Sequence, residues 1–259
     1  MKNTFALCIS MFICSCSGYQ YVPNPHYVPL HKEKGEIICN GGLGKIQLGY
    51  SLLNHFAVFA AGKYRYSTNK FDNLGVRDSD YDMPDSMDIA MDANIGVGFF
   101  KHLGKFVFET YASPGFGKLD YTHTYENSYD TSYFFNLNSK RFNVYIQQNF
   151  GILINKYFEV AISAKFTKFV YYDINNQIYG QDINRNISSD TYFLGKKTVS
   201  MAFFEPGLTF RGGFQNFKIQ WQIIKAYNLI KNPVNFRDLS SFISFNMNLN
   251  VLKSNKRKN

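Results

Sequence analysis

The stretch Phe245-Asn246-Met247-Asn248-Leu249-Asn250-Val251 alternates strictly between an apolar side chain and asparagine. Successive side chains of a β-strand point to opposite faces, so this segment presents one apolar and one polar face. Residues 217–224, 158–167 and 89–99 repeat the pattern, with apolar residues on one face and mostly polar or small residues on the other. The sequence therefore predicts an all-β fold whose strands separate an apolar environment from a polar one.

The composition is rich in aromatic residues, with 26 Phe and 19 Tyr against 1 Trp in 259 residues. A lipid-facing surface with aromatic girdles at both membrane interfaces accounts for this better than a water-soluble core does. No window reaches the roughly 20 apolar residues of a transmembrane helix. Strands that cross a bilayer must close into a barrel, because every backbone polar group in lipid needs a partner. We therefore expect a single antiparallel up-and-down transmembrane β-barrel at residues 35–252.

The alternating segments predict about ten strands. These lie near residues 35–44, 45–53, 56–67, 88–100, 105–122, 139–154, 157–172, 196–212, 216–227 and 239–252. The parity of the apolar positions changes near residues 44–45, which indicates a tight turn there and places both chain ends in the periplasm. The alternatives are a barrel of about eight strands and, least favoured, one of about nine with a long first strand.

The predicted connections alternate in length. Short ones lie at 54–55, 101–104, 155–156 and 213–215, and long ones near 68–87, 123–138, 173–195 and 228–238. Outer-membrane barrels have short periplasmic turns and longer extracellular loops. We therefore expect the long loops to lie outside the cell.

Residues 1–15 predict a lipoprotein signal peptide, which is removed from the mature chain. A basic residue at position 2 and a short apolar run precede Ile13-Cys14-Ser15-Cys16, which resembles a bacterial lipobox. In such a sequence the last cysteine is acylated, so Cys16 is the expected lipidation site and membrane anchor. The alternatives are an ordinary cleaved secretory signal and acylation at Cys14, which the bulky residues before it disfavour.

Residues 16–34 carry Cys16 and three prolines and predict an extended linker between the lipid, in the inner leaflet of the outer membrane, and the barrel. Cys39 is then the one free cysteine, so we expect no intramolecular disulfide and no metal cluster of cysteines. Residues 253–259 form a basic periplasmic tail. The formal net charge is +9, but the basic residues are scattered and no nucleic-acid-binding motif is present, so no nucleic-acid partner is expected.

Several short segments resemble a group of uncharacterised outer-membrane β-barrel lipoproteins of Bacteroidota. They are Tyr21-Val22-Pro23-Asn24, Val28-Pro29-Leu30, Glu33-Lys34-Gly35-Glu36, Leu53-Asn54-His55-Phe56-Ala57-Val58 and Glu205-Pro206-Gly207-Leu208-Thr209-Phe210-Arg211-Gly212. The local resemblance covers about residues 16–62, and the remainder is similar only in layout. The resemblance implies a fold and a location, and it implies no activity or catalytic residues.

A set of charged residues falls on the polar face of the predicted strands and should point into the barrel. These are Lys63, Arg65, Asp92, Glu109, Arg141, Glu159, Lys165, Glu205, Arg211 and Lys218. We expect an interior polar network that fills the barrel, because the interior of a barrel of about eight strands is just filled by side chains. The alternative is a narrow path for water, ions or small solutes.

Two loop features allow sharper hypotheses. The acidic loop 72–88 could hold Ca²⁺ through its carboxylates, but its spacing departs from the EF-hand pattern, and we expect a solvated loop tip. The loop's acidic residues are Asp72, Asp78, Asp80, Asp82, Asp85 and Asp88. His123 lies close to Glu126 and Ser128, a combination found in hydrolases, but common residue types at short spacing are weak evidence.

We therefore expect a lipid-anchored outer-membrane barrel that is not an enzyme, has no cofactor or metal, and has a structural or surface-interaction role. The expected partners are outer-membrane lipids, lipopolysaccharide and the barrel-assembly and lipoprotein-sorting machinery; the surface ligand is not predicted. The alternatives are a narrow pore, an outer-membrane lipid or peptide hydrolase, and a soluble periplasmic barrel that binds a ligand inside.

Overall fold

The computed structural model describes residues 19–68, 86–127, 131–180, 193–230, 234 and 236–249. These residues form an antiparallel up-and-down barrel of 10 strands with one extra short strand, as the alternating segments predicted. Within these ranges, no helix is long and apolar enough to span a membrane.

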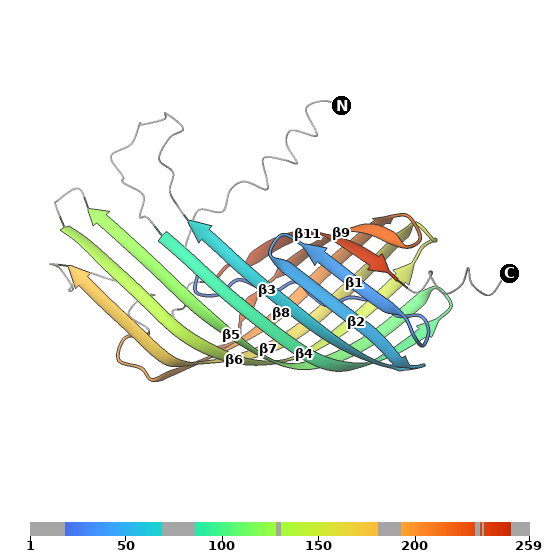
Figure 1. Ribbon diagram of the computed structural model, residues 1–259, viewed down its shortest axis with the longest axis horizontal. Coiled ribbons are helices and arrows are strands. Elements are labelled where there is room, and N and C mark those ends of the chain that lie inside the picture. The colour runs from blue at the N-terminus through green and yellow to red at the C-terminus, as the bar shows by residue number, and fades with distance from the viewer. Residues whose placement is uncertain are drawn as a thin grey trace, which may run out of the picture.

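Apart from the short β10, each strand pairs with the next one along the chain, and the first strand pairs with the last (Figure 1). The strands are β1 (Ile37–Gly42), β2 (Lys45–Leu53), β3 (Phe56–Thr68), β4 (Ser86–Leu103), β5 (Phe106–Asn127), β6 (Thr131–Leu153), β7 (Phe158–Gly180), β8 (Thr198–Gly213), β9 (Phe217–Lys225), β10 (Tyr227–Asn228) and β11 (Leu239–Asn248). The short β10 adds to β8 beyond the end of β9, and β9 pairs with both β8 and β11. The sheet therefore closes on itself.

The barrel has two unlike ends. At one end, which we call the turn rim, every connection is short: residues 54–55, 104–105, 154–157 and 214–216. At the other end, the loop rim, the β1–β2 turn at residues 43–44 and the β5–β6 connection at 128–130 are also short, whereas residues 69–85 join β3 to β4 and residues 181–197 join β7 to β8. Figure 1 shows that the long strands β4–β7 project at the loop rim far beyond the blue β1–β2 hairpin. The wall is therefore low at β1 and β2 and high on the opposite side.

The strands near the turn rim have an apolar outer face and a polar inner face. Large apolar side chains point outward and are exposed, such as Ile95 at 69% and Ile162 at 58%. Their inward neighbours include buried Gln147, Asn149 and Ser163. This arrangement follows directly from the period-two alternation in the sequence.

The polarity reverses toward the loop rim. On β5 and β6 the outward positions become Lys118, Asp120 and Asn138, whereas the inward Leu119 and Leu137 are fully buried in an apolar cluster. The prediction of long loops near 123–138 and 173–195 is therefore wrong in part, because β5 and β6 run on to residues 127 and 131, and β7 runs on to residue 180. The strands were predicted from apolar residues on the outer face. In these extensions the apolar residues face inward, so they were not recognised as strand.

Closure of the barrel can be tested with a cysteine that the chain already has. Cys39 of β1 is a free thiol directly opposite Met247 of β11. Opposite residues of antiparallel strands have Cα atoms about 4.5–5.5 Å apart, a separation that a disulfide can span. We expect Met247→Cys to form an intramolecular disulfide on oxidation, seen as faster migration of the unfolded protein on a non-reducing gel.

Two controls accompany this variant. Ser241→Cys, exposed on the same strand but far from Cys39 in register, should stay reduced. Met247→Cys combined with Cys39→Ser should also form no intramolecular disulfide. A Met247→Cys protein that stays reduced while correctly folded would show that β1 and β11 are not paired.

Candidate functional site

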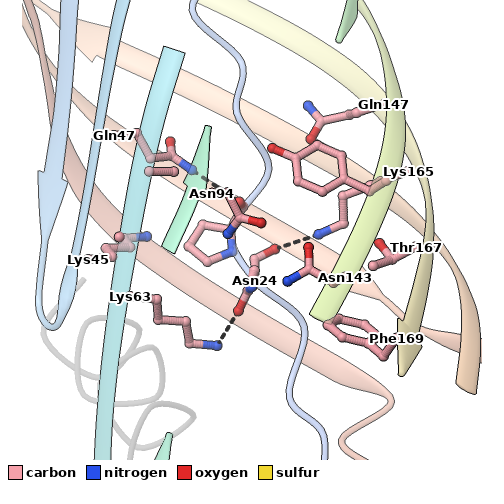
Figure 2. Close-up of a pocket in the computed structure, with 14 residues that line it drawn as sticks. Asn24, Lys45, Gln47, Lys63, Asn94, Asn143, Gln147, Lys165, Thr167 and Phe169 are labelled. Atoms are coloured by element: carbon pink, nitrogen blue, oxygen red, sulfur yellow. Dashed lines mark hydrogen bonds between the residues drawn. The ribbon is translucent and has the colours of Figure 1, made fainter. Parts of the chain in front are cut away.

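The segment expected to be an external linker lies inside the barrel. From Gln20 to His31 every residue is buried except Val22 and Asn24, which are half-buried. The backbone passes through the lumen, as the chain beside Asn24 in Figure 2 shows, and Leu30 near its C-terminal end has a positive φ of 58°. We call residues 19–31 the plug. The expected location of this segment, in a linker outside the barrel, is therefore wrong.

The barrel wall satisfies the plug's backbone. Each carbonyl oxygen from residue 19 to residue 29 accepts a hydrogen bond from a group outside the plug. In chain order, the donors are Arg65, Tyr171, the backbone N–H of Arg237, Lys63 twice, Lys165, Gln47, Gln222, Gln147 together with Asn149, and Arg211 twice. The contacts come from all sides of the lumen, so the plug is held centrally.

Figure 2 shows this arrangement at Asn24. Lys63 of β3 and Lys165 of β7 point toward it from different walls of the barrel. The Lys63 ammonium donates to the Asn24 side-chain oxygen at 3.0 Å, and the Lys165 ammonium donates to the Asn24 carbonyl at 3.2 Å. Gln47 donates to the carbonyl of Pro25 at 3.1 Å.

The three prolines explain why this segment fits this wall. Pro23, Pro25 and Pro29 have no N–H, so the plug has three fewer backbone donors than acceptors. The wall is the complement, with Lys, Arg, Gln and Asn side chains pointing inward. Two N–H groups of the plug donate to acceptors on the wall: Tyr27 N–H donates to Gln147 Oε1 at 3.3 Å, and His31 N–H to Glu109 Oε1 at 2.9 Å.

The charged residues expected in the interior all line the lumen. All are buried except Lys63 and Arg65, which are half-buried. They are Lys63, Arg65, Asp92, Glu109, Arg141, Glu159, Lys165, Glu205, Arg211 and Lys218. Cations outnumber carboxylates by six to four in this set. The surplus of donors is what the plug carbonyls use.

Ion pairs connect the strands within the lumen, both adjacent strands and strands with one other strand between them. Arg141 donates through two nitrogens to the carboxylate of Asp92, one bond being 2.7 Å long. Lys165 pairs with Glu205 at 2.6 Å, and Lys218 with Glu159 at 2.9 Å. A buried charge needs both a partner and further hydrogen bonds to offset its desolvation. The pairs meet the first requirement, and for Lys165 the plug carbonyl of Asn24 meets the second.

Aromatic rings fix the plug at two levels. Tyr21 stacks on Phe203 with ring centroids 4.1 Å apart, and Tyr27 stacks on Phe59 at 4.3 Å. Tyr27 also meets Tyr111 edge-on at 4.8 Å. Such pairs contribute about 0.5–1.5 kcal/mol beyond their buried area. The side chains of the plug therefore pack against the barrel wall as those of a protein core do.

The lumen is filled at the loop rim and beside Asn24. At the loop rim Tyr21 joins an apolar cluster with Leu119, Phe135 and Phe203, which Val234 from the β9–β11 connection covers. The enclosed cavity beside Asn24 has a volume of only about 30 Å³. That is room for water and not for a solute. The described chain therefore leaves no open solute path through the barrel.

At the turn rim Glu36 contacts the C-terminal end of the plug. Its carboxylate accepts the Lys32 N–H at 2.7 Å and lies 3.5 Å from the His31 ring. Burial alone would raise the pKa of Glu36, but these contacts hold it below its ordinary range, so Glu36 is ionised at neutral pH. The Glu36 backbone pairs with Ser51 of β2, where β1 begins.

One luminal cluster has the residue types of a hydrolase. His26 Nδ1 lies 2.6 Å from Ser163 Oγ, and His26 Nε2 lies 3.9 Å from Glu205. However, Tyr21 and Lys165 already occupy the Glu205 carboxylate. His26 and Glu205 are fully buried. The contacts instead hold His26 against the wall.

The remaining sequence hypotheses fall outside what the structure describes. This applies to Cys16, to Asp72–Asp85 of the acidic loop with the Asp88 side chain, and to the side chains of His123, Glu126 and Ser128. Within the described ranges, no group of three or more His, Cys, Asp or Glu residues could hold a metal ion. The plug and the amide donors that bind it, Gln47, Gln147, Asn149 and Gln222, were not predicted from the sequence. The three prolines and the apolar and aromatic residues of this segment were the sequence features that could have indicated its burial.

A glycine substitution tests whether the plug occupies the lumen. A Cβ at Gly49 would lie 1.5 Å from the Tyr27 hydroxyl oxygen, so Gly49→Ala must displace the Tyr27 ring. Overpacking of this kind costs about 1–3 kcal/mol. We expect faster amide hydrogen exchange across residues 19–34, measured by mass spectrometry.

Gly62→Ala is the matched control. A Cβ at Gly62 would meet only Ile46 at 3.6 Å and the Asp92 carbonyl at 4.0 Å, which are ordinary contacts. Exchange across residues 19–34 should stay at the wild-type rate in this variant. Equal exchange in the two variants would mean that Tyr27 does not pack against β2.

Comparison with known proteins adds no family to this description. No protein-family model matches the chain, and no curated protein shows significant similarity to it. The function must therefore be inferred from the barrel and its filled lumen.

Proposed function

We propose that this protein is an outer-membrane β-barrel that does not conduct solutes and that serves as a structural or surface-interaction protein. The observation that carries the proposal is the reversal of polarity along the strands. Near the turn rim the outer wall is apolar, and toward the loop rim it becomes polar while the inside becomes apolar.

The reversal matches a barrel that is partly in lipid and partly in water. On β5 the outward series runs through Phe106, Phe108 and Phe116 and then changes to Lys118 and Asp120. A lipid-facing band of a transmembrane barrel is apolar and flanked by aromatic residues. Beyond the band, water outside favours polar outward residues, and the interior can then be an ordinary apolar core. In a soluble ligand-binding barrel the outer wall faces water, so an outer apolar band would be unfavourable.

A filled lumen argues for a non-conducting role. Polar side chains line the interior, as in a channel, but the plug uses their hydrogen-bonding capacity. The parts of the molecule left to meet other molecules are the projecting ends of β4–β7 and the connections between them. This supports a surface-interaction role, with outer-membrane lipids and lipopolysaccharide as the surroundings of the wall.

The hydrolase alternative finds little support in the described residues. The His26, Ser163 and Glu205 cluster is enclosed, and its carboxylate is paired. An active hydrolase needs a substrate carbonyl within reach of its nucleophile. The proposal therefore assigns these residues to positioning the plug.

Conductance measurements in planar lipid bilayers test the proposal. We expect no stable current steps from the inserted wild-type protein, with insertion verified by heat-modifiable gel migration. Gly49→Ala, which displaces Tyr27, should increase the leak current, and Gly62→Ala should not. Regular current steps from the wild-type barrel would show a pore, and a monomeric protein in detergent-free buffer would exclude the membrane location.

A further inference from the structure

The plug runs through the barrel in a defined direction. Its N-terminal end is at the loop rim, where the Tyr19 carbonyl accepts from Arg65 at 3.1 Å and the Gln20 carbonyl from Tyr171 at 3.3 Å. Tyr21 pairs there with Phe236 of the β9–β11 connection. Its C-terminal end is at the turn rim, where the Gly35 N–H donates to the Ser51 carbonyl at 2.8 Å.

The N-terminal end lies beside the lowest part of the wall. Arg65 directly follows Tyr64, whose N–H donates to the carbonyl of Gly44 in the β1–β2 turn at 2.7 Å. This turn is the lowest point of the loop rim, and Leu43 at its tip is fully exposed. The outward side chains next to it, Ile46 and Tyr64, are also exposed. On this side the apolar band reaches the rim itself.

The length of chain before Tyr19 limits where the N-terminus can reach. Cys16 precedes Tyr19 by three residues, which extend over at most about 10 Å. The hydrocarbon core of a bilayer is about 30 Å thick. A residue so close to Tyr19 therefore cannot reach the leaflet at the turn rim while the plug stays in the lumen.

We propose that the plug delivers the N-terminus through the barrel to the loop rim, so that the acyl chains on Cys16 insert into the membrane leaflet beside the β1–β2 turn. This inference rests on the proposed function, which makes that leaflet the outer one. The anchor then lies at the cell surface, opposite to the inner-leaflet position expected from the sequence. The plug is the connection between the surface anchor and the first strand, and the low wall at β1–β2 lets the lipid reach the bilayer.

Cysteine labelling on whole cells tests the direction of the plug. All variants carry Cys39→Ser, and the probe is a membrane-impermeant maleimide. Lys196→Cys marks the loop rim and Asn54→Cys the turn rim, since both positions are exposed. We expect Tyr19→Cys to label on intact cells to the same extent as Lys196→Cys, whereas Asn54→Cys should label only after the outer membrane is permeabilised.

The markers separate the possible failures. If Lys196→Cys labels on intact cells but Tyr19→Cys labels only after permeabilisation, the proposed direction is overturned and the barrel orientation stands. If Lys196→Cys itself requires permeabilisation, the proposed orientation fails instead. If Tyr19→Cys is protected throughout, a benzophenone amino acid at position 19 decides: cross-links to peptides of β3 or β7 near Arg65 and Tyr171 support the loop-rim position, and cross-links to turn-rim peptides instead overturn it.

Discussion

Hydrogen bonding between the plug carbonyls and the luminal side chains is the constraint on which the rest of the structure depends. A buried donor or acceptor without a partner costs about 1–3 kcal/mol, and a charged one costs more. The lumen holds many donors, and the carboxylates of the wall cannot accept from all of them. The plug reduces this deficit with a row of carbonyls, and its three prolines add no backbone donor. The wall and the plug therefore stabilise each other, because separating them would leave buried donors and carbonyls without hydrogen-bond partners.

The same rule explains the unequal ends of the barrel. Within the apolar band the outer face is apolar, so the polar side chains lie inside the barrel. There the plug carbonyls accept hydrogen bonds from them. Toward the loop rim the outer face is polar, and the interior becomes a conventional core in which Leu119, Phe135 and Phe203 surround Tyr21. The plug takes part in both zones, through its backbone in the first and through the Tyr21 ring in the second. A single segment thus links two chemically different halves of one barrel.

Much of the barrel could be predicted from the sequence because strand periodicity is a local signal. The alternation at residues 217–224 and 158–167 recurs in β9 and β7, and the split near residue 44 is the β1–β2 turn. The inward position of charged residues such as Arg141 and Glu205 follows from the same parity. The turn at 54–55 was also predicted, since a tight turn interrupts the alternation abruptly, whereas the connection predicted at 101–104 is the two-residue turn at 104–105.

The plug and the strand extensions could not be predicted in this way. A proline-containing segment without periodicity is typical of a linker, and its burial depends on donors that lie far away in sequence, such as Arg211 and Gln222. The extensions of β5 and β6 keep the alternation but exchange the two faces, so a search for outward apolar residues passes over them. In both cases the deciding interactions are between distant parts of the chain.

Photo-cross-linking from inside the lumen would examine the plug itself. A benzophenone amino acid in place of Tyr27 would lie among Phe59 and Tyr111, so irradiation of the folded protein should join residue 27 to peptides of β3 and β5, identified by mass spectrometry. The same residue in an externally placed linker would instead react with detergent or lipid, or would form no link to these strands. Cross-links to β3 and β5 are the outcome that a plugged barrel requires, and their absence in correctly folded protein would mean that the lumen is not filled by this segment.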